Sequence, residues 1–355
     1  MIPSVMKAAI CKEAGKPLVI EEVPVPSTKG REVLVRVQSA SLCHSDVSIV
    51  AGALGTGFFP QIIGHEAVSV VVKLGTDASR FGLKVGDLIG APLWHDMCLD
   101  CFSCQDSGPQ FCGQMQVKGL TAPGYFAEYT LVDAASAVVI PAGLDIPTPS
   151  LAPLFCAGVT VWDALTRARL QPGESVAIVG VGGLGELAAK YATALGAKVI
   201  ALDTRDGQLE AIQAGGYADK VFNTTSVQAE EVGSHVAALN GGRGLDIAIV
   251  TSGAVPAYQT ALSILKAEGR LVAVGLPHGP LPLVLPLVTG QATQILGSKV
   301  PGKEGSTKCL EFSLRKGILP KVHPRKFRLE DINEMIDLMN AGQVQDGRMV
   351  VEFSV

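Results

Sequence analysis

The sequence predicts an α/β protein of two parts, a barrel-like β domain followed by a domain built on a doubly wound parallel sheet. The chain has 355 residues, of which 48% are hydrophobic and 40 are glycine, so it is long enough for two cores and too apolar to be disordered. Short β-type runs fill its first half, whereas apolar strands alternate with helical stretches from about residue 156 onward. This change of pattern predicts the two domains.

The first half is predicted to form a mostly antiparallel, barrel-like domain. Gly and Pro separate its β-type runs, which include REVLVRVQSA at 31–40, AVSVVVKLG at 67–75 and GYFAEYTLV at 124–132. Closely spaced strands with turn signals between them are typical of such a fold.

The second half is predicted to form a parallel sheet with helices on both faces. It begins with a strand at 175–180 (SVAIVG), a helix at 185–196 (GELAAKYATALG) and a second strand at 198–203 (KVIALD). The alternation continues as far as RLVAVGLP at 270–277. Strand, helix and strand at this spacing indicate crossover units of a parallel sheet.

The C-terminal segment is predicted to return to the first domain. It contains two helical stretches, at 303–317 and 329–342, and a last strand, RMVVEFSV at 348–355, which has no parallel-sheet context of its own. We therefore expect one domain from residues 1–157 and 295–355, and the other from residues 158–294.

Composition excludes several classes of protein. The formal charge of −4 is spread along the chain without a basic stripe, so we expect no nucleic-acid partner. Apolar runs such as LPLVLPLV are short and broken by proline, and the N-terminus lacks the pattern of a signal peptide, so we expect no membrane partner. Eight cysteines in such a chain are expected to be reduced, and the predicted location is the cytoplasm.

A glycine loop follows the first strand of the second half. Gly180, Gly182 and Gly185 have the G-x-G-x-x-G spacing, with a strand before them and a helix after them, as in a Rossmann dinucleotide site. The next strand ends at Asp203, where a carboxylate would bind the ribose hydroxyls and disfavour a 2′-phosphate. We therefore predict NAD as the cofactor, although the nearby Arg205 leaves NADP open; an ordinary glycine turn is the competing interpretation.

Four cysteines gather in the stretch CLDCFSCQDSGPQFC at residues 98–112, with the spacing C-x2-C-x2-C-x7-C. Four thiolates suit a tetrahedral zinc ion and leave no open position for a substrate. The spacing does not fit the short bacterial pattern of an iron–sulfur cluster, which ends in C-x3-C-P. Cys98, Cys101, Cys104 and Cys112 are therefore predicted to hold a structural zinc.

A second set of candidate ligands is scattered along the chain. These are Cys43, the pair His65–Glu66, and Cys156. The cysteines could be ordinary buried thiols, and the pair could simply be hydrogen-bonded. They lie so far apart in the sequence that their spacing cannot show whether they form one site, so a catalytic metal site stays an open possibility.

These motifs together resemble the zinc-dependent medium-chain alcohol dehydrogenases, especially their microbial tetrameric branch. The resemblance covers nearly the whole chain and rests on CHSD, GHE, the cysteine-rich lobe, LFCAGVTVWDAL, GVGGLG, GSKV and the terminal GRMVVEF, in that joint order. It implies a GroES-like catalytic domain with a zinc lobe at 95–115, a Rossmann domain, two zinc ions per chain and a homotetramer or homodimer.

Site residues are carried over from the resemblance. It implies that Cys43, His65 and Cys156 bind a catalytic zinc, that Glu66 lies beside the metal and can exchange onto it, and that Asp46 orients the ligand histidine. Ser45 matches the first member of the family's proton relay. The implied cofactor contacts are His44, Gly183, Leu184, Val274 and Arg348, in addition to the glycine loop, Asp203 and Arg205.

The implied reaction interconverts an alcohol and an aldehyde or ketone by zinc-assisted hydride transfer to or from NAD(H). Two departures from the family concern protons and substrate. The relay of many relatives ends in a histidine where this chain has Ser48, and serine is no base near neutral pH. Leu54 stands where ethanol-oxidising relatives have a tryptophan, which suggests a larger substrate unless Phe58 and Phe59 fill the space. Trp94 matches the other wall of the pocket.

Two other functions stay open at this point. A dedicated biosynthetic reductase of one larger carbonyl or enone substrate would explain the altered relay and pocket. A non-catalytic protein that binds zinc and a nucleotide would keep the fold, because fold alone does not imply function. Cys156 argues against polyol dehydrogenases, which usually have glutamate as the third ligand, and the two cysteine sets argue against the zinc-free quinone reductases.

Overall fold

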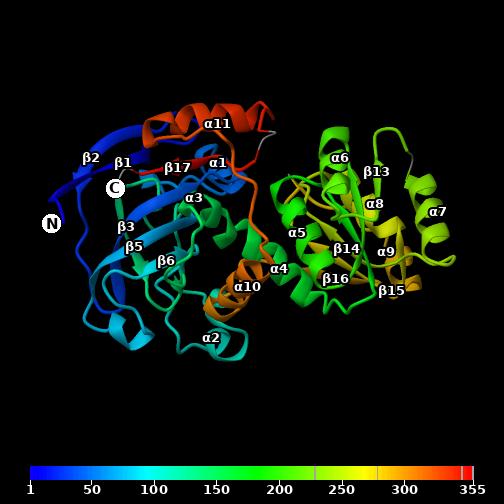
Figure 1. Cartoon of the computed structure of the whole chain (residues 1–355), viewed down its shortest axis with the longest axis horizontal. Helices are drawn as coiled ribbons and strands as arrows, with labels where there is room; N and C mark the ends of the chain where they lie inside the picture. The colour runs from blue at the N-terminus through cyan, green and yellow to red at the C-terminus, as the bar shows by residue number, and fades with distance from the viewer. Residues whose placement is uncertain (228, 278, 345–346, 354–355) are drawn as a thin grey trace. The chain divides into compact units, whose positions relative to one another are not determined.

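The computed structural model describes residues 1–227, 229–277, 279–344 and 347–353, and the chain folds as two compact units. The first unit comprises Met1–Cys156, Val300–Phe312 and Leu319–Val355, and the second comprises Ala157–Lys299 and Ser313–Ile318. Figure 1 follows the chain from the N-terminus in blue to the C-terminus in red. The two-part α/β fold predicted from the sequence is confirmed.

The described residues of the first unit form three sheets. One has the order β2-β1-β4 and a second pairs β7 with β8, while the largest has the order β10-β6-β5-β3-β17, with β9 also paired to β3. All of these pairings are antiparallel. The strands are β1 (Val5–Cys11), β2 (Val19–Pro24), β3 (Glu32–Ser41), β4 (Gln61–Ile62), β5 (Ala67–Leu74), β6 (Leu88–Ala91), β7 (Trp94–His95), β8 (Gln116–Val117), β9 (Tyr129–Asp133), β10 (Val138–Val139) and β17 (Val350–Glu352).

Short helices connect these strands, and longer ones follow in the C-terminal part. They are α1 (His44–Val50), η1 (Ala78–Phe81), α2 (Phe102–Asp106), η2 (Pro109–Phe111), α3 (Thr148–Leu151), η3 (Ala152–Phe155), α10 (Lys303–Lys316), η4 (Leu329–Asp331) and α11 (Ile332–Asn340). The predicted helix at 329–342 is thus a turn of η4 followed by α11. The predicted last strand is β17, which pairs with β3 as expected of a return to the first unit; its residues 354 and 355 lie outside the described residues.

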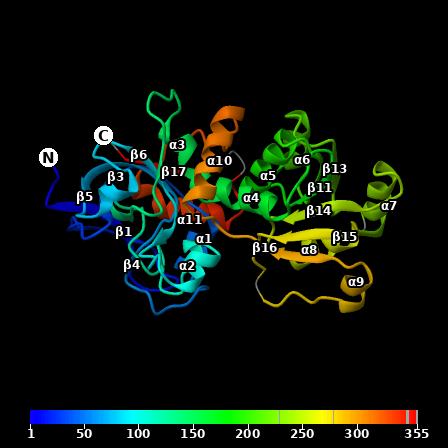
Figure 2. The same cartoon turned by 90° about the horizontal axis from the view of Figure 1, so that it is seen from below.

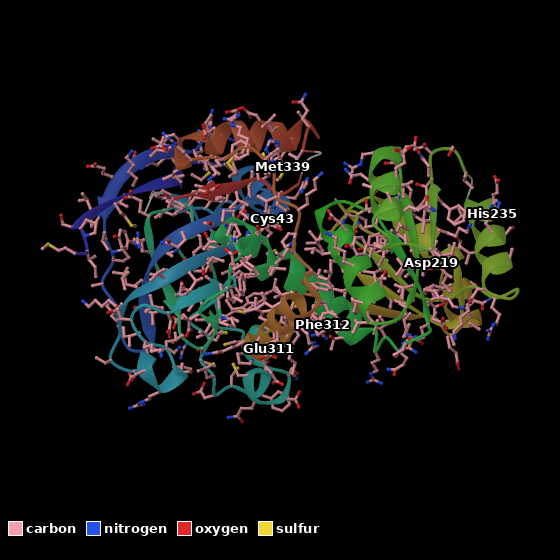
Figure 3. The ribbon with its side chains drawn as sticks, viewed as in Figure 1. Cys43, Asp219, His235, Glu311, Phe312 and Met339 are labelled. Atoms are coloured by element: carbon pink, nitrogen blue, oxygen red, sulfur yellow. The ribbon has the colours of Figure 1, made fainter. Side chains whose placement is uncertain are left out.

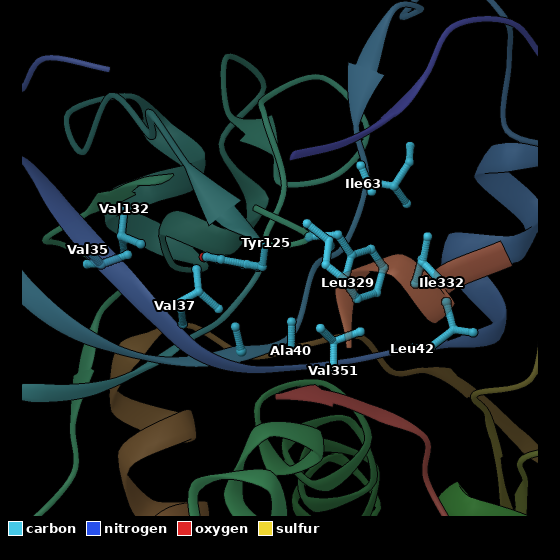
Figure 4. Close-up of a cluster of buried hydrophobic side chains, with 14 of the residues drawn as sticks. Val35, Val37, Ala40, Leu42, Ile63, Tyr125, Val132, Leu329, Ile332 and Val351 are labelled. Atoms are coloured by element: carbon cyan, nitrogen blue, oxygen red, sulfur yellow. The ribbon is translucent and has the colours of Figure 1, made fainter. Parts of the chain in front are cut away.

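The core of the first unit is a cluster of aliphatic and aromatic side chains (Figure 4). Val35, Val37 and Ala40 of β3 contribute to it and are almost completely buried, as is Tyr125. Helix α11 supplies Ile332, Met335, Ile336 and Met339, whose spacing of three and four residues places them on one helix face. Burial of this amphipathic face is what holds the C-terminal helix to the barrel.

The second unit is built on a six-stranded parallel sheet with the order β13-β12-β11-β14-β15-β16. Figure 2 shows β14, β15 and β16 side by side. The strands are β11 (Ser175–Val179), β12 (Lys198–Asp203), β13 (Lys220–Asn223), β14 (Leu245–Val250), β15 (Leu265–Ala273) and β16 (Gln294–Gly297). The helices are α4 (Ala157–Arg167), α5 (Gly183–Ala194), α6 (Asp206–Ala214), α7 (Ala229–Leu239), α8 (Val255–Ser263) and α9 (Leu285–Gly290).

The strand order of this sheet reverses between β11 and β14. From β11 the chain moves outward through β12 and β13, and it then returns to add β14, β15 and β16 on the other side. All five residues of β11 are buried, as expected for a central parallel strand. A reversal of this kind is the topological switch point at which doubly wound sheets bind nucleotides.

The expected division between residues 294 and 295 falls inside β16. This strand pairs with β15 from Gln294 to Gly297, so the second unit extends to Lys299. The end of α10 also belongs to the second unit, where the hydroxyls of Ser313 and Tyr191 lie 2.7 Å apart. Pairing of an edge strand, which the sequence pattern does not reveal, therefore sets this boundary.

Candidate active site and metal centres

A three-residue cluster lies inside the first unit, where the sequence offered only scattered candidates. Cys43 caps the N-terminus of α1, His65 precedes β5, and Cys156 follows η3. The two sulfurs and a ring nitrogen of His65 all lie within 4.8 Å of one another, with 3.2 Å between His65 Nε2 and Cys156 Sγ. Figure 3 marks Cys43 at the start of α1. The fold thus assembles the implied ligand set from three separate segments.

Asp46 holds two of these residues in place. Its Oδ1 lies 2.7 Å from His65 Nδ1, and its Oδ2 accepts a hydrogen bond of 3.0 Å from the backbone N–H of Cys43. The carboxylate is completely buried. Because Asp46 holds Nδ1, Nε2 is the ring nitrogen that faces the sulfurs and can bind a metal ion once it is deprotonated.

The charge on these groups is set by burial and by their neighbours. Burial alone would lower the pKa of His65, but the charge and hydrogen bond of Asp46 outweigh it and raise that pKa well above its usual value. A hydrogen bond from Cys156 lowers the pKa of Cys43 well below that of an ordinary thiol. The cluster therefore favours a thiolate at Cys43, the form in which cysteine binds metals.

Glu66 and Arg348 form a buried ion pair beside the cluster, although 282 residues separate them. Arg348 Nη2 donates to Glu66 Oε1, and its Nε donates to Ser41 Oγ at 3.4 Å. Burial raises the pKa of Glu66 to about 7, against the opposing charge of Arg348. Glu66 Oε2 is buried and has no hydrogen-bond partner among the described residues. The structure thus places Arg348, expected to contact the cofactor, against Glu66.

These residues fit a zinc ion. Two sulfurs and one imidazole nitrogen are three of the four ligands of a catalytic zinc site, which keeps its fourth position for water or substrate. The buried, unpartnered Oε2 of Glu66 is a polar atom that a nearby cation would satisfy.

The four cysteines of the lobe also converge. Their Sγ atoms all lie within 4.8 Å of one another, with 3.8 Å from Cys98 to Cys104 and 3.5 Å from Cys101 to Cys104. A tetrahedron with a metal–sulfur distance of ~2.3 Å separates its sulfurs by about 3.8 Å. No cysteine of the described residues forms a disulfide. The geometry matches a closed, four-sulfur zinc site.

The glycine loop lies between β11 and α5, at the switch point of the parallel sheet. Gly180 has φ of 96°, in the region that favours glycine, and a Cβ at Gly185 would lie 1.9 Å from Gly180 O. Helix α5 begins at Gly183 and, among the described residues, no side chain caps its N-terminus. Its first N–H groups and positive dipole end therefore offer a binding site for a pyrophosphate.

Asp203 is the centre of a hydrogen-bond network at the end of β12. Its carboxylate accepts from the backbone N–H groups of Val181, Thr204 and Arg205 at 2.6, 2.8 and 3.0 Å. The Arg205 guanidinium also lies 3.2 Å from Asp203 Oδ1, and 3.9 Å from the place of a Cβ at Gly182. Asp203, which is predicted to bind the ribose of the cofactor, is thus paired with Arg205, the residue that would favour a 2′-phosphate. Val274 directly follows β15, and Leu184 lies in the first turn of α5.

The remaining predicted residues lie in the first unit. His44 and Ser45 are exposed on the first turn of α1, with 3.9 Å between Ser45 Oγ and Cys43 Sγ. Leu54 is 46% exposed in the turn after α1. Trp94 is 5% exposed, and its indole N–H donates to Val300 O and Pro301 O, so its ring is part of the interior in this unit. Its expected role as a pocket wall stays a prediction.

The sequence analysis missed some buried polar residues. It had no signal for the ion pair of Glu66 with Arg348, because the partners are remote in sequence. It also missed Lys118 and His95, which are charged or polar but only 1% and 8% exposed. Lys118 stands in the plain turn sequence VKGLT, which gives no sign of burial.

A dinucleotide-type sheet and a buried Cys–His–Cys cluster in one chain define a metal-dependent dehydrogenase. Comparison with known proteins agrees: residues 29–142 match the model of an alcohol dehydrogenase GroES-like domain, and residues 183–314 match that of a zinc-binding dehydrogenase. The chain belongs to the zinc-dependent alcohol dehydrogenase family. The predicted family, fold class and enzyme class are confirmed, and zinc and NAD(P) are its cofactors.

Individual relatives match over almost their whole length. An alcohol dehydrogenase of Rhizobium meliloti (strain 1021) is 35% identical over 351 residues, which are 98% of this chain and 99% of the relative. One of Geobacillus stearothermophilus is 34% identical over 355 residues, with coverage of 98% and 99%. The crystal structure of the alcohol dehydrogenase from the archaeon Aeropyrum pernix superimposes with a TM-score of 0.87 at 30% identity, covering 98% of this chain and 100% of that one.

Proposed function

We propose that this protein interconverts an alcohol and an aldehyde or ketone, with Cys43, His65 and Cys156 holding the reactive zinc and the four-cysteine lobe holding a structural zinc. The observation that carries the proposal is the contrast between the two clusters. Four sulfurs close one site, whereas two sulfurs and an imidazole leave the other open. A protein that only binds zinc and a nucleotide has no need of an open site.

Zinc supplies Lewis acidity when it is bound, which favours loss of the alcohol proton near neutral pH and polarises a carbonyl in the reverse direction. Asp46 keeps the His65 ring in one tautomer and one orientation through its 2.7 Å contact. Glu66 and Arg348 add one negative and one positive charge at the edge of the cluster, so the pair contributes little net charge there. The unpartnered Glu66 Oε2 is the atom that could exchange onto the metal.

Ser45 is proposed to carry the proton of the alcohol away from the site. Its hydroxyl is exposed and lies 3.9 Å from Cys43 Sγ, close to the ligand cluster. Ser48, three residues further along α1, is partly buried and cannot act as a base near neutral pH. The proton is therefore passed from Ser45 to solvent, and we expect a pH dependence of alcohol oxidation that differs from that of a histidine relay.

The proposed cofactor is NAD, bound by the glycine loop, with Gly182, Gly183 and Leu184 at the pyrophosphate. Asp203 is 8% exposed and carries the charge that would repel a 2′-phosphate. Arg205, which is 49% exposed, is free to turn toward such a phosphate, so we expect measurable activity with NADP as well.

A direct test measures both the zinc content per chain and the rate of carbonyl reduction. The wild type should contain about two zinc ions per chain and reduce carbonyl compounds with NADH. Cys156→Ser should keep the lobe's zinc and lose activity, while Cys104→Ser should lose the lobe's zinc. One zinc per chain in the wild type, bound only at the lobe, together with no turnover, would refute the proposal and favour the non-catalytic alternative.

The substrate is proposed to be larger than ethanol. Leu54 is smaller than the tryptophan of ethanol-oxidising relatives, and Phe59 packs against the core of the first unit. A rate series from acetaldehyde to bulky aromatic aldehydes tests this. Turnover of large compounds alone would support a dedicated reductase of one larger carbonyl or enone substrate.

We further propose a homotetramer or homodimer that works in the cytoplasm. Exposed apolar side chains, Leu276, Val284 and Leu285, lie in the segment before the edge strand β16, and such a surface is typical of an interface. Light scattering tests the subunit number. Reduced cysteines fit the cytoplasm. Among the described residues, no helix has the length and apolar character needed to cross a bilayer.

A further inference from the structure

A separate cavity lies in the first unit, apart from both cysteine clusters. Its volume is about 390 Å³, enough for a small organic molecule. Apolar side chains such as Met6, Val23 and Ile62 form much of its wall. Lys118, His95 and Glu32 also line it, although the mechanism proposed above uses none of them.

Lys118 lines this cavity, and its amine has an unusual set of partners. The side chain is 1% exposed, and Nζ donates to Thr130 Oγ1 and to Leu131 O, both at 2.8 Å. A neutral amine has two N–H donors and one lone pair, so these two acceptors occupy both donors and leave the lone pair unused. No described carboxylate lies within ion-pair distance of Nζ.

The surroundings favour this neutral form. Burial lowers the pKa of Lys118 to about 7, and the charge of Glu32 only partly opposes it. The ammonium form is favoured by the charge of Glu32, by the two acceptors and by the ring of Tyr125, whose centroid lies 5.0 Å from Nζ, but burial outweighs them. The neutral amine is therefore much more populated near pH 7 than in an ordinary lysine, whose pKa is about 10.4.

His95 is the second polar group in the cavity wall. It lies on β7, whose partner β8 pairs His95 with Gln116, two residues before Lys118. Burial, followed by the charge of Lys118, lowers the pKa of His95 to about 3, so the ring is neutral. Its Nδ1 is buried and has no partner among the described residues, while Nε2 lies 3.7 Å from Glu32 Oε1. The ring is therefore a neutral polar group in the cavity wall.

We propose that this cavity is a second carbonyl site, at which Lys118 Nζ forms a reversible imine with a small aldehyde or ketone. The lone pair of Nζ attacks the carbonyl carbon, a C–N bond forms, and the carbonyl oxygen becomes a hydroxyl. That oxygen then leaves as water with the two amine hydrogens, and a C=N bond remains. No oxidant or reductant is needed, and the family's own reaction supplies or consumes the carbonyl compound. The proposal is independent of zinc and of the nicotinamide site.

The nearby polar groups suit this step. His95 and Glu32 line the same cavity as Lys118, so the hydroxyl of the carbinolamine would form in a cavity with polar groups in its wall. Thr130 Oγ1 accepts a hydrogen bond from Nζ at 2.8 Å and donates its own proton to Pro123 O at 3.4 Å, so it holds the amine in place. A desolvated lysine in an apolar pocket is a known way to obtain a nucleophilic amine.

The test treats the zinc-loaded full chain with propanal and cyanoborohydride at pH 7, without dinucleotide, so that no propanal is consumed by the dehydrogenase. Cyanoborohydride converts an imine into a stable secondary amine, which is located by peptide mass spectrometry. Lys118 should be labelled at least about ten times faster than the exposed Lys73 and Lys84 of the same unit. Labelling at Lys118 no faster than at those two lysines would overturn the proposal.

Two variants separate the site from general reactivity. Lys118→Met should remove the fast label, leave the surface lysines unchanged and keep dehydrogenase activity. Ile62→Trp keeps the amine but fills the cavity, and it should slow the label at Lys118 about tenfold. An unchanged rate in Ile62→Trp would overturn the role of the cavity even if Lys118→Met failed to fold. If the wild type did not oxidise alcohols at all, that result would count against the proposed dehydrogenase function and not against the imine site.

Discussion

Replacing Asp46 by asparagine removes one charge and almost no volume. The carboxylate contacts His65 Nδ1 at 2.7 Å and the Cys43 N–H at 3.0 Å, and it is completely buried. An amide can donate to Nδ1, which would move the ring proton to Nε2 and block the nitrogen that faces the sulfurs. We expect the affinity of the open site for zinc to fall about 10- to 100-fold. This corresponds to about 1.4–2.8 kcal/mol.

Competition with a chromophoric chelator measures this affinity, and the four-cysteine lobe serves as an internal reference because its zinc should be retained. Asp133→Asn is a matched control: Asp133 is 1% exposed, accepts hydrogen bonds from Arg31 and from the Ala135 N–H, and belongs to the same unit. It should affect stability but not the affinity of the open site. If Asp46→Asn bound the second zinc as tightly as the wild type, the assigned role of Asp46 would be wrong.

Three further predictions concern the lobe, the cofactor and the buried amine. Cys104→Ser should lose about one zinc per chain by atomic emission and lower Tm by on the order of 5–10 °C; an unchanged metal content would contradict the four-sulfur site. Arg205→Ala should reduce kcat/KM for NADPH about 10- to 150-fold and leave that for NADH nearly unchanged, since a charged hydrogen bond contributes ~1.5–3 kcal/mol; equal losses would argue against a phosphate contact. The lowered pKa of Lys118, about 7, means that the unfolded chain binds more protons between pH 7 and about 10. Stability should therefore rise with pH in that window by up to ~1.4 kcal/mol per unit, and urea unfolding of Lys118→Met should lack this slope.

Local features of the site could be predicted from sequence because their spacing carries the information. The four cysteines lie within residues 98–112, and the glycine loop with its flanking strand and helix lies within 175–194. The Cys43, His65 and Cys156 cluster is different, because its three segments are distant in sequence. Pairing of β3 with β5 brings Cys43 near His65, and the packing of η3 on these strands adds Cys156. Only the resemblance to a family suggested that set before the structure was known.

The features of the site that the sequence could not predict are contacts between buried polar residues. Glu66 and Arg348 neutralise each other across 282 residues, and no periodicity marks them. Asp203 was expected to face a ribose, but its carboxylate also bonds four N–H donors of its own unit, which depends on how the loop folds back over β12. Lys118 looks like a solvated turn residue, and only the placement of β8 and β9 shows it to be buried.

The two metal centres also differ in when they can form during synthesis. All four ligands of the lobe leave the ribosome within fifteen residues, so this short loop can close around its metal at a small entropic cost while the rest of the chain is still nascent. The other centre needs Cys156 together with Cys43, and the guanidinium of Arg348 can reach Glu66 only after residue 348 has been added. If zinc were scarce during translation, it would thus fill the lobe first. The resulting protein molecules would have a folded lobe with its structural zinc but no zinc at the reactive site.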